Sequence, residues 1–168
     1  GLGAGATLVS GAPSLSAAAG RRLAAVAAMG YAVSILPAHM AFVRLVPRLP
    51  LTFSGDLLLL AAILTLPYLL AGISVALLLT GSGRRVHAAY GWNLLGSGAG
   101  CFTVFLLLRP LGGEAFVVLI VVLAGVAALA LSWPLETWMR QVAILVLLST
   151  AAPLLRPGAF LRFPPERL

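Results

Sequence analysis

The sequence has no lysine, a single cysteine and only four acidic residues among its 168 positions. One cysteine, Cys101, excludes an intrachain disulfide and a cysteine-based metal cluster. Neither an HExxH nor a GxSxG motif occurs, and no apolar segment carries a pair of carboxylates, so acid–base and nucleophilic chemistry lack their usual residues. We therefore predict that this chain has no catalytic residue, no metal site, no cofactor and no activity of its own.

Charge of either sign is also scarce. Only 9% of the residues are charged and 61% are hydrophobic, whereas about a quarter of a soluble domain is charged. This composition indicates an integral membrane protein, which we place in the bacterial inner membrane with lipid as a partner. The eleven basic residues are all arginines, spread along the edges of apolar segments as at membrane boundaries. They are not gathered on one face, so no nucleic-acid partner is predicted.

The apolar runs predict an all-α fold, a polytopic bundle of transmembrane helices with no sheet. Pro37 and Pro67 interrupt two of the runs and should bend the helices there. We expect one transmembrane domain over residues 1–155 and an exit segment or linker over 156–168 that leads into the rest of a longer protein. The expected spans are 23–46, 57–80, 87–108, 115–133 and a weaker one at 138–155, and residues 1–10 read as the tail of an earlier helix.

The weaker segment, 138–155, leaves two topologies open because Arg140 and Gln141 shorten its apolar run. A full crossing divides the arginines five against six, and a segment that turns back divides them eight against three, which the positive-inside rule favours. We adopt the full crossing as the prediction. In that topology Arg21, Arg22, Arg84, Arg85 and Arg140 lie on one side, and Arg44, Arg48, Arg109, Arg156, Arg162 and Arg167 on the other.

Small residues repeat at helical spacing along the third span. Gly96 and Gly100 form a GxxxG pair, which allows close helix packing in lipid. A dinucleotide-binding loop would need a strand before these glycines, so we interpret them as a packing surface. We expect this face to touch a similar one on the second span, and we interpret the N-terminal GLGAGA as another small-residue helix surface. The two faces comprise Ala89, Asn93, Gly96, Gly100 and Thr103, and Ala61, Thr65, Tyr68, Gly72 and Ala76.

Three polar residues within the spans, His39, Tyr68 and Asn93, are the candidates for function, since polar groups are costly in hydrocarbon. Asn93 suits an amide bonded to a neighbouring helix, and a substrate or quinone contact is the alternative. His39 follows Pro37 by two positions and suits a hydrogen bond to a freed carbonyl, with a proton relay or a haem or chlorin ligand as alternatives. Tryptophan and tyrosine at the span ends are expected at the membrane interfaces.

Several short motifs follow one another in the second and third spans. They are an LPY motif followed by Ala-Gly, a basic loop, and then a tyrosine, a polar position, Leu-Leu-Gly and Gly-Cys. In this sequence they read Leu66-Pro67-Tyr68, Ala71-Gly72, Arg84-Arg85, Tyr90, Asn93, Leu94-Leu95-Gly96 and Gly100-Cys101. Together these motifs resemble the membrane region of spermidine-synthase-like membrane proteins, which more usually have Asp at the position of Asn93. The resemblance implies that a soluble Rossmann-like, aminopropyltransferase-like domain follows the membrane region. No catalytic residue of the family is carried over to the membrane region itself.

Three functions follow as hypotheses. The first is a noncatalytic membrane region that anchors or scaffolds a downstream aminopropyl- or methyltransferase-like domain. The second is an accessory structural subunit of a larger membrane complex, such as a photosynthetic or electron-transfer complex, with helix–helix contacts to other subunits. The third is a transporter fragment, which the small number of spans disfavours. The acidic residues support a structural role, because Asp56, Glu114, Glu136 and Glu166 all fall in expected loops or the tail.

Overall fold

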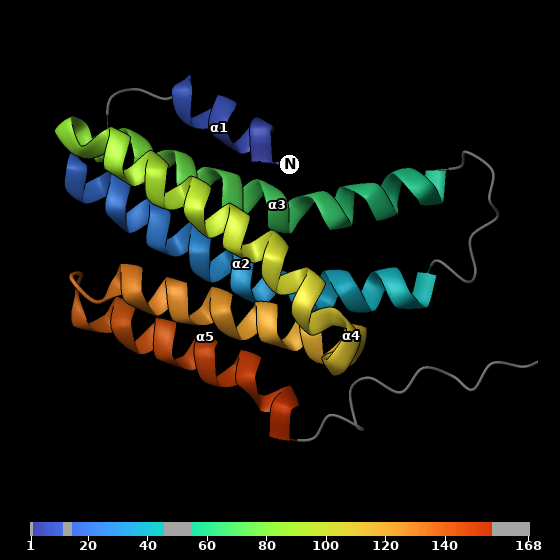
Figure 1. Cartoon of the computed structure of the whole chain (residues 1–168). Helices are drawn as coiled ribbons and strands as arrows, with labels where there is room; N and C mark the ends of the chain where they lie inside the picture. Colours follow the sequence, from blue (N-terminus) through green and yellow to red (C-terminus); the bar gives the residue numbers. More distant parts are fainter. Residues whose placement is uncertain (1, 12–14, 46–54, 156–168) are drawn as a thin grey trace, which may run out of the picture.

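The computed structural model describes residues 2–11, 15–45 and 55–155, apart from the side chains of residues 2, 56, 114 and 152–155. Throughout this part of the chain the regular structure is helical, as predicted, and no strand occurs in it. Its helices are α1 (Leu2–Ser10), α2 (Ala17–Leu45), α3 (Gly55–Gly81), the short 3₁₀ helix η2 (Gly83–Arg85), α4 (Val86–Ser132) and α5 (Thr137–Leu155). Figure 1 shows α2 in the middle of the bundle, and it contacts α3, α4 and α5.

Four helical segments are long and apolar enough to cross a membrane, as expected of an integral membrane protein. They are Ala17–Leu45, Leu57–Gly81, Gly83–Gly113 and Ala115–Ser132, which correspond to the four stronger predicted spans. The first begins at Ala17 rather than at residue 23, because the Ser16 hydroxyl accepts a hydrogen bond from the Ala19 backbone N–H (3.3 Å) and caps the helix there. Arg21 and Arg22 therefore lie within α2 and not before it.

The helix α4 consists of two antiparallel helices that meet at Gly112. The backbone of Gly112 has φ 76° and ψ 164°, a conformation that glycine reaches without a side-chain clash. Figure 1 shows the chain reversing its direction there. We call residues 86–111 the first half of α4 and residues 113–132 the second half. The reversal confirms the expected break at 111–114, although Pro110 lies within the helix and not after it.

The fifth helix, α5, runs antiparallel to the second half of α4 (Figure 1). Its 19 residues extend over about 28 Å, close to the roughly 30 Å of a hydrocarbon core. Whether α5 crosses the membrane completely stays a prediction. The expected loop at 47–54 and the exit segment 156–168 lie outside the described residues. Pro37 and Pro67 both lie inside continuous helices, and in Figure 1 α2 and α3 diverge toward the ends that follow Pro37 and precede Pro67.

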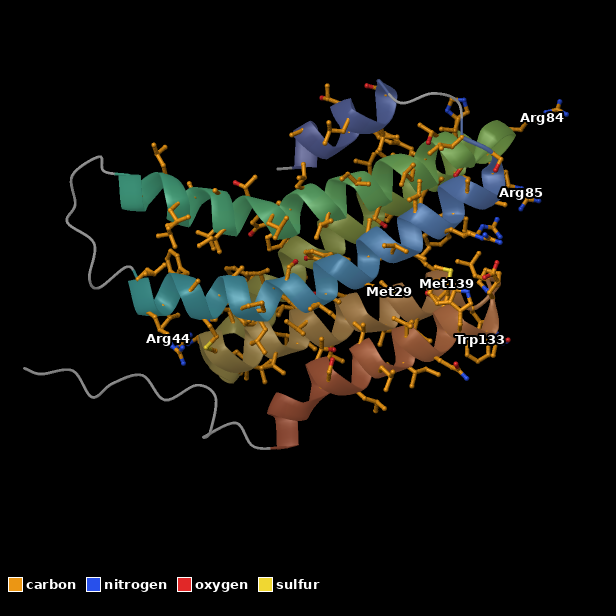
Figure 2. All side chains as sticks on the ribbon, turned by 180° about the vertical axis from the view of Figure 1, so that it is seen from behind. Met29, Arg44, Arg84, Arg85, Trp133 and Met139 are labelled. Carbon is orange, nitrogen blue, oxygen red and sulfur yellow. The ribbon has the colours of Figure 1, made fainter. Side chains whose placement is uncertain are left out.

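A buried hydrophobic cluster joins α2, the second half of α4 and α5. Ala128 and Ala143 are fully buried there, and the only large side chains among them are those of two methionines. Small side chains let the three helix backbones approach closely, which is the main source of helix association in lipid. The cluster consists of Ala25, Ala28, Met29, Ala128, Met139 and Ala143, and Figure 2 shows Met29 and Met139 close together at this seam.

Candidate functional site

The part of α3 around Gly72 is covered by α1. A Cβ atom placed on Gly5 would lie 2.7 Å from both the Leu69 carbonyl oxygen and the Ile73 backbone nitrogen. Only a glycine permits such an approach between two helix backbones. Gly72 is buried beneath this contact. At Gly5 the interpretation of the N-terminal GLGAGA as a small-residue helix surface is therefore confirmed, whereas Gly3 is exposed and Gly1 lies outside the described residues.

The expected close contact between Gly72 and the pair Gly96 and Gly100 is wrong. Both glycines of the pair are exposed, and a Cβ atom on either would meet nothing within 4 Å. No residue of the apolar window of Gly83–Gly113 is buried, whereas 22% to 39% of the window is buried in the other three membrane-length helices. The physical reason is that α1 packs its own small residue, Gly5, against α3 around Gly72, so the first half of α4 cannot pack there.

A cavity of about 520 Å³ separates the first half of α4 from α1 and α3. Asn93 lines it together with Gly72 and Ala76, so these members of the two predicted faces lie around one space, whereas Gly96 and Gly100 do not line it. Asn93, Ala89 and Thr103 are half-buried. The wall is mostly apolar, with lining residues Ala6, Val9, Ser10, Gly72, Val75, Ala76, Leu79, Thr80, Asn93 and Ser97.

A second cavity, of about 440 Å³, lies between α2, α3 and the second half of α4 and brings His39 and Tyr68 together. His39 is half-buried, but Tyr68 is 57% exposed, so the expectation of a buried Tyr68 is wrong. Ala61 and Thr65, on the same predicted face, are exposed as well. This part of α3 lies where α2 and α3 diverge (Figure 1), and it buries Leu60 and Pro67 while the side chains of the predicted face stay exposed.

Tyr31 is a residue of this second cavity that the sequence did not single out. It precedes His39 by eight positions on α2, and Ile35 and Phe42, which also line the cavity, continue the same helical stripe. The helical spacing of Tyr31 from His39 is the sequence feature that could have identified it. A mainly apolar cavity with a few polar tips can hold an apolar molecule or lipid chain and orient it with a hydrogen bond.

Charged and aromatic side chains meet at one end of the bundle. Arg22 forms an ion pair with Glu136, and the Trp138 indole N–H donates a hydrogen bond to the same carboxylate. The guanidinium of Arg140 lies 5.8 Å from the centre of the Trp133 ring and donates a hydrogen bond to the Thr137 hydroxyl (3.2 Å). Trp133 and Trp138 are 64% and 56% exposed, as interfacial tryptophans are. Figure 2 places Trp133, Arg84 and Arg85 at this end and Arg44 at the other.

No protein-family model matches the chain, and neither a curated protein nor a solved structure matches it. Among the described residues, no group of three His, Cys, Asp or Glu side chains could hold a metal ion. The features that remain are two mainly apolar cavities, an arginine-rich end and an uncovered helix surface on the first half of α4.

Proposed function

We propose that this chain is a noncatalytic membrane region that acts as an anchor or scaffold, and that the first half of α4 is the surface on which another membrane helix docks. The observation that carries the proposal is that no residue in the apolar window of Gly83–Gly113 is buried. Small residues exposed to lipid make few dispersion contacts, whereas the same residues at a helix interface allow close backbone packing. Gly96 and Gly100 are such residues, and both are exposed.

The docking helix belongs to the parent protein or to a neighbouring subunit of the inner membrane. If it belongs to the parent protein, the chain corresponds to the membrane region of a spermidine-synthase-like protein, whose motif residues lie on α3, η2 and the first half of α4. Gly72 and Asn93, from the two halves of that motif, line one cavity, which supports this reading. If it belongs to another subunit, the chain is an accessory subunit, which the exposure of the first half of α4 favours equally.

A Thr103→Cys variant in a Cys101→Ser background offers a direct test, because Thr103 lies on the face of Gly96 and Gly100, whereas Cys101 lies about 100° around the helix from Gly100. We expect a short thiol-reactive cross-linker to join the introduced thiol to one discrete partner in native membranes. Replacing Gly100 with Leu should abolish that product, because the larger side chain holds the helices apart. Replacing Leu94 with Ala should leave it unchanged, because Leu94 lies outside the small-residue face. Equal yields from both variants would contradict the proposal, since a random collision does not depend on the face.

The source of the partner helix is identified by the mass of the cross-linked product. An intramolecular product at the mass of the parent protein supports the anchor of a longer chain, and a product of larger mass supports the accessory subunit. Cross-linking that also proceeds with the chain alone in lipid nanodiscs, at high dilution, would show that no partner is needed and would contradict both.

A further inference from the structure

A third cavity, of about 520 Å³, opens at the arginine-rich end of the bundle. Its size is within the range of small-molecule sites, about 300 to 1,000 Å³. The wall combines the beginning of α2 with the turn between α4 and α5. The residues that line it are Ala17, Ala18, Arg21, Arg22, Pro134, Leu135 and Glu136. Two arginines and one carboxylate face a single space.

The charges of this third cavity do not cancel. Glu136 pairs with Arg22 and also accepts the hydrogen bond from Trp138, so its carboxylate is engaged on both sides. Glu136 is the only acidic residue whose side chain the structure describes, and Arg22–Glu136 is the only ion pair among the described residues. The charge of Arg21 is therefore not neutralised by any described acid, and the cavity carries a net positive charge.

The ion pair also fixes one wall of the third cavity, because it ties α2 to the turn before α5. A guanidinium held in this way presents its remaining donors in a fixed orientation, and the planar fork of arginine suits two oxygens of a phosphate. Arg21 and Arg22 are adjacent in the helix and both line the space. The wall is thus suited to an anion with several oxygens.

The third cavity lies at the depth of lipid headgroups. The turn that forms it lies between the exposed Trp133 and Trp138, and tryptophans concentrate at the membrane interface. The anion most abundant at that depth is the phosphate diester of a phospholipid, and basic pockets between membrane helices bind anionic headgroups. Leu135 and the alanines at the start of α2 give the space an apolar side, which can contact the first methylene groups of an acyl chain next to the glycerol.

We propose that this cavity is a binding site for the phosphate-bearing headgroup of an anionic phospholipid, with Arg21 as the main contact and Arg22 held in place by Glu136. This site is separate from the docking surface on α4. An anionic lipid bound there fastens the start of α2 to the turn between α4 and α5.

The test compares two single variants that remove the same charge from the same end of the bundle. Arg21 lines the cavity, whereas Arg84 is exposed in η2 and does not line it. The full chain in a neutral detergent is titrated with phosphatidylglycerol, and the bound lipid is counted by native mass spectrometry. We expect Arg21→Gln to weaken binding about tenfold, the effect of one charge-assisted hydrogen bond, and Arg84→Gln to change it less than about twofold. Equal losses from the two variants would show general attraction to charge and overturn the site.

Further arms separate the lipid from other ligands and from misfolding. Phosphatidylcholine, which is neutral overall, should bind much more weakly than phosphatidylglycerol, and equal binding would overturn the proposal. Inorganic phosphate should not displace the lipid, and displacement at comparable concentration would make free phosphate the ligand. Arg21→Lys keeps the charge but loses the fork, so we expect affinity between those of the native chain and Arg21→Gln. A fully native affinity for Arg21→Lys would contradict the proposed two-oxygen contact.

Discussion

The hydroxyl of Ser74 on α3 donates a hydrogen bond to the backbone carbonyl oxygen of Ala24 on α2, 3.0 Å away, and this bond is buried. Ser74 is 6% exposed and Ala24 is fully buried. A hydrogen bond between helices in a membrane contributes about 0.6 kcal/mol on average and up to about 1.7 kcal/mol. It joins α2 and α3 on the side of the bundle where the two helices have not yet diverged (Figure 1).

Replacing Ser74 with Ala should lower the free energy of unfolding by about 1 kcal/mol, because the bond to Ala24 is lost and nothing replaces it. Ser97→Ala is the control, since the Ser97 hydroxyl bonds to the Asn93 carbonyl within its own helix on an exposed surface. Unfolding by denaturant in mixed micelles measures both variants. Equal stability of the two would mean that the bond between α2 and α3 contributes nothing.

Gly125 and Gly96 should respond oppositely to the same substitution. A Cβ atom on Gly125 would lie 3.3 Å from the Leu147 Cα and 3.3 Å from the Thr150 hydroxyl oxygen, whereas one on Gly96 would meet nothing within 4 Å. We expect Gly125→Leu to destabilise the chain by about 1 to 3 kcal/mol through overpacking against α5. Gly96→Leu should leave the stability of the purified chain unchanged. A large loss for Gly96→Leu in the purified chain would show that its face is covered by this chain itself.

The packing of α1 against α3 depends on Gly5. A leucine at Gly5 would meet the backbone of α3 at 2.7 Å, but a leucine at Gly3 would meet nothing within 4 Å. We therefore expect Gly5→Leu to release α1 and to speed the hydrogen exchange of its backbone amides, while Gly3→Leu leaves the exchange slow. Rapid exchange of α1 in the unmodified chain would contradict the packing described here.

Hydropathy and the proline and glycine breaks predicted the all-α fold, the four membrane-length helices and the reversal near Gly112, because each depends on local sequence. The partner of each small-residue face did not follow from the sequence. Three helices carry such faces, at Gly5, Gly72 and Gly96, and nothing local says which two of them meet. The structure pairs Gly5 with the backbone around Gly72 and leaves Gly96 uncovered.

The charged end of the bundle was similarly beyond local reasoning. The sequence placed Glu136 between two interfacial tryptophans, and the hydrogen bond from Trp138 fits that position. Its ion pair with Arg22 joins residues far apart in the chain, so only the folded bundle shows it. The cavity that His39 shares with Tyr68 and Tyr31 likewise depends on the packing of separate helices, so the sequence alone does not show it.

The chain should show no turnover when it is purified in detergent and given a polyamine with an aminopropyl donor. Binding a polyamine needs carboxylates, and Glu136 is already engaged with Arg22 and Trp138. Product formation followed by mass spectrometry measures this. Turnover above background that is lost in Asp56→Asn or in Glu114→Gln would contradict the noncatalytic role, because the replaced residue would then belong to an active site.

The docking surface on the first half of α4 is tested most directly by a nitroxide label at Gly96, in a Cys101→Ser background, with Phe105 as the control site. Phe105 is 82% exposed and lies on the opposite face of the helix. In the purified chain in lipid nanodiscs, oxygen should reach both labels freely, as on a lipid-facing helix. In native membranes we expect the label at Gly96 to become protected from oxygen and the label at Phe105 to stay accessible. Equal accessibility of Gly96 in the two settings would show that lipid alone covers this face and would contradict the account.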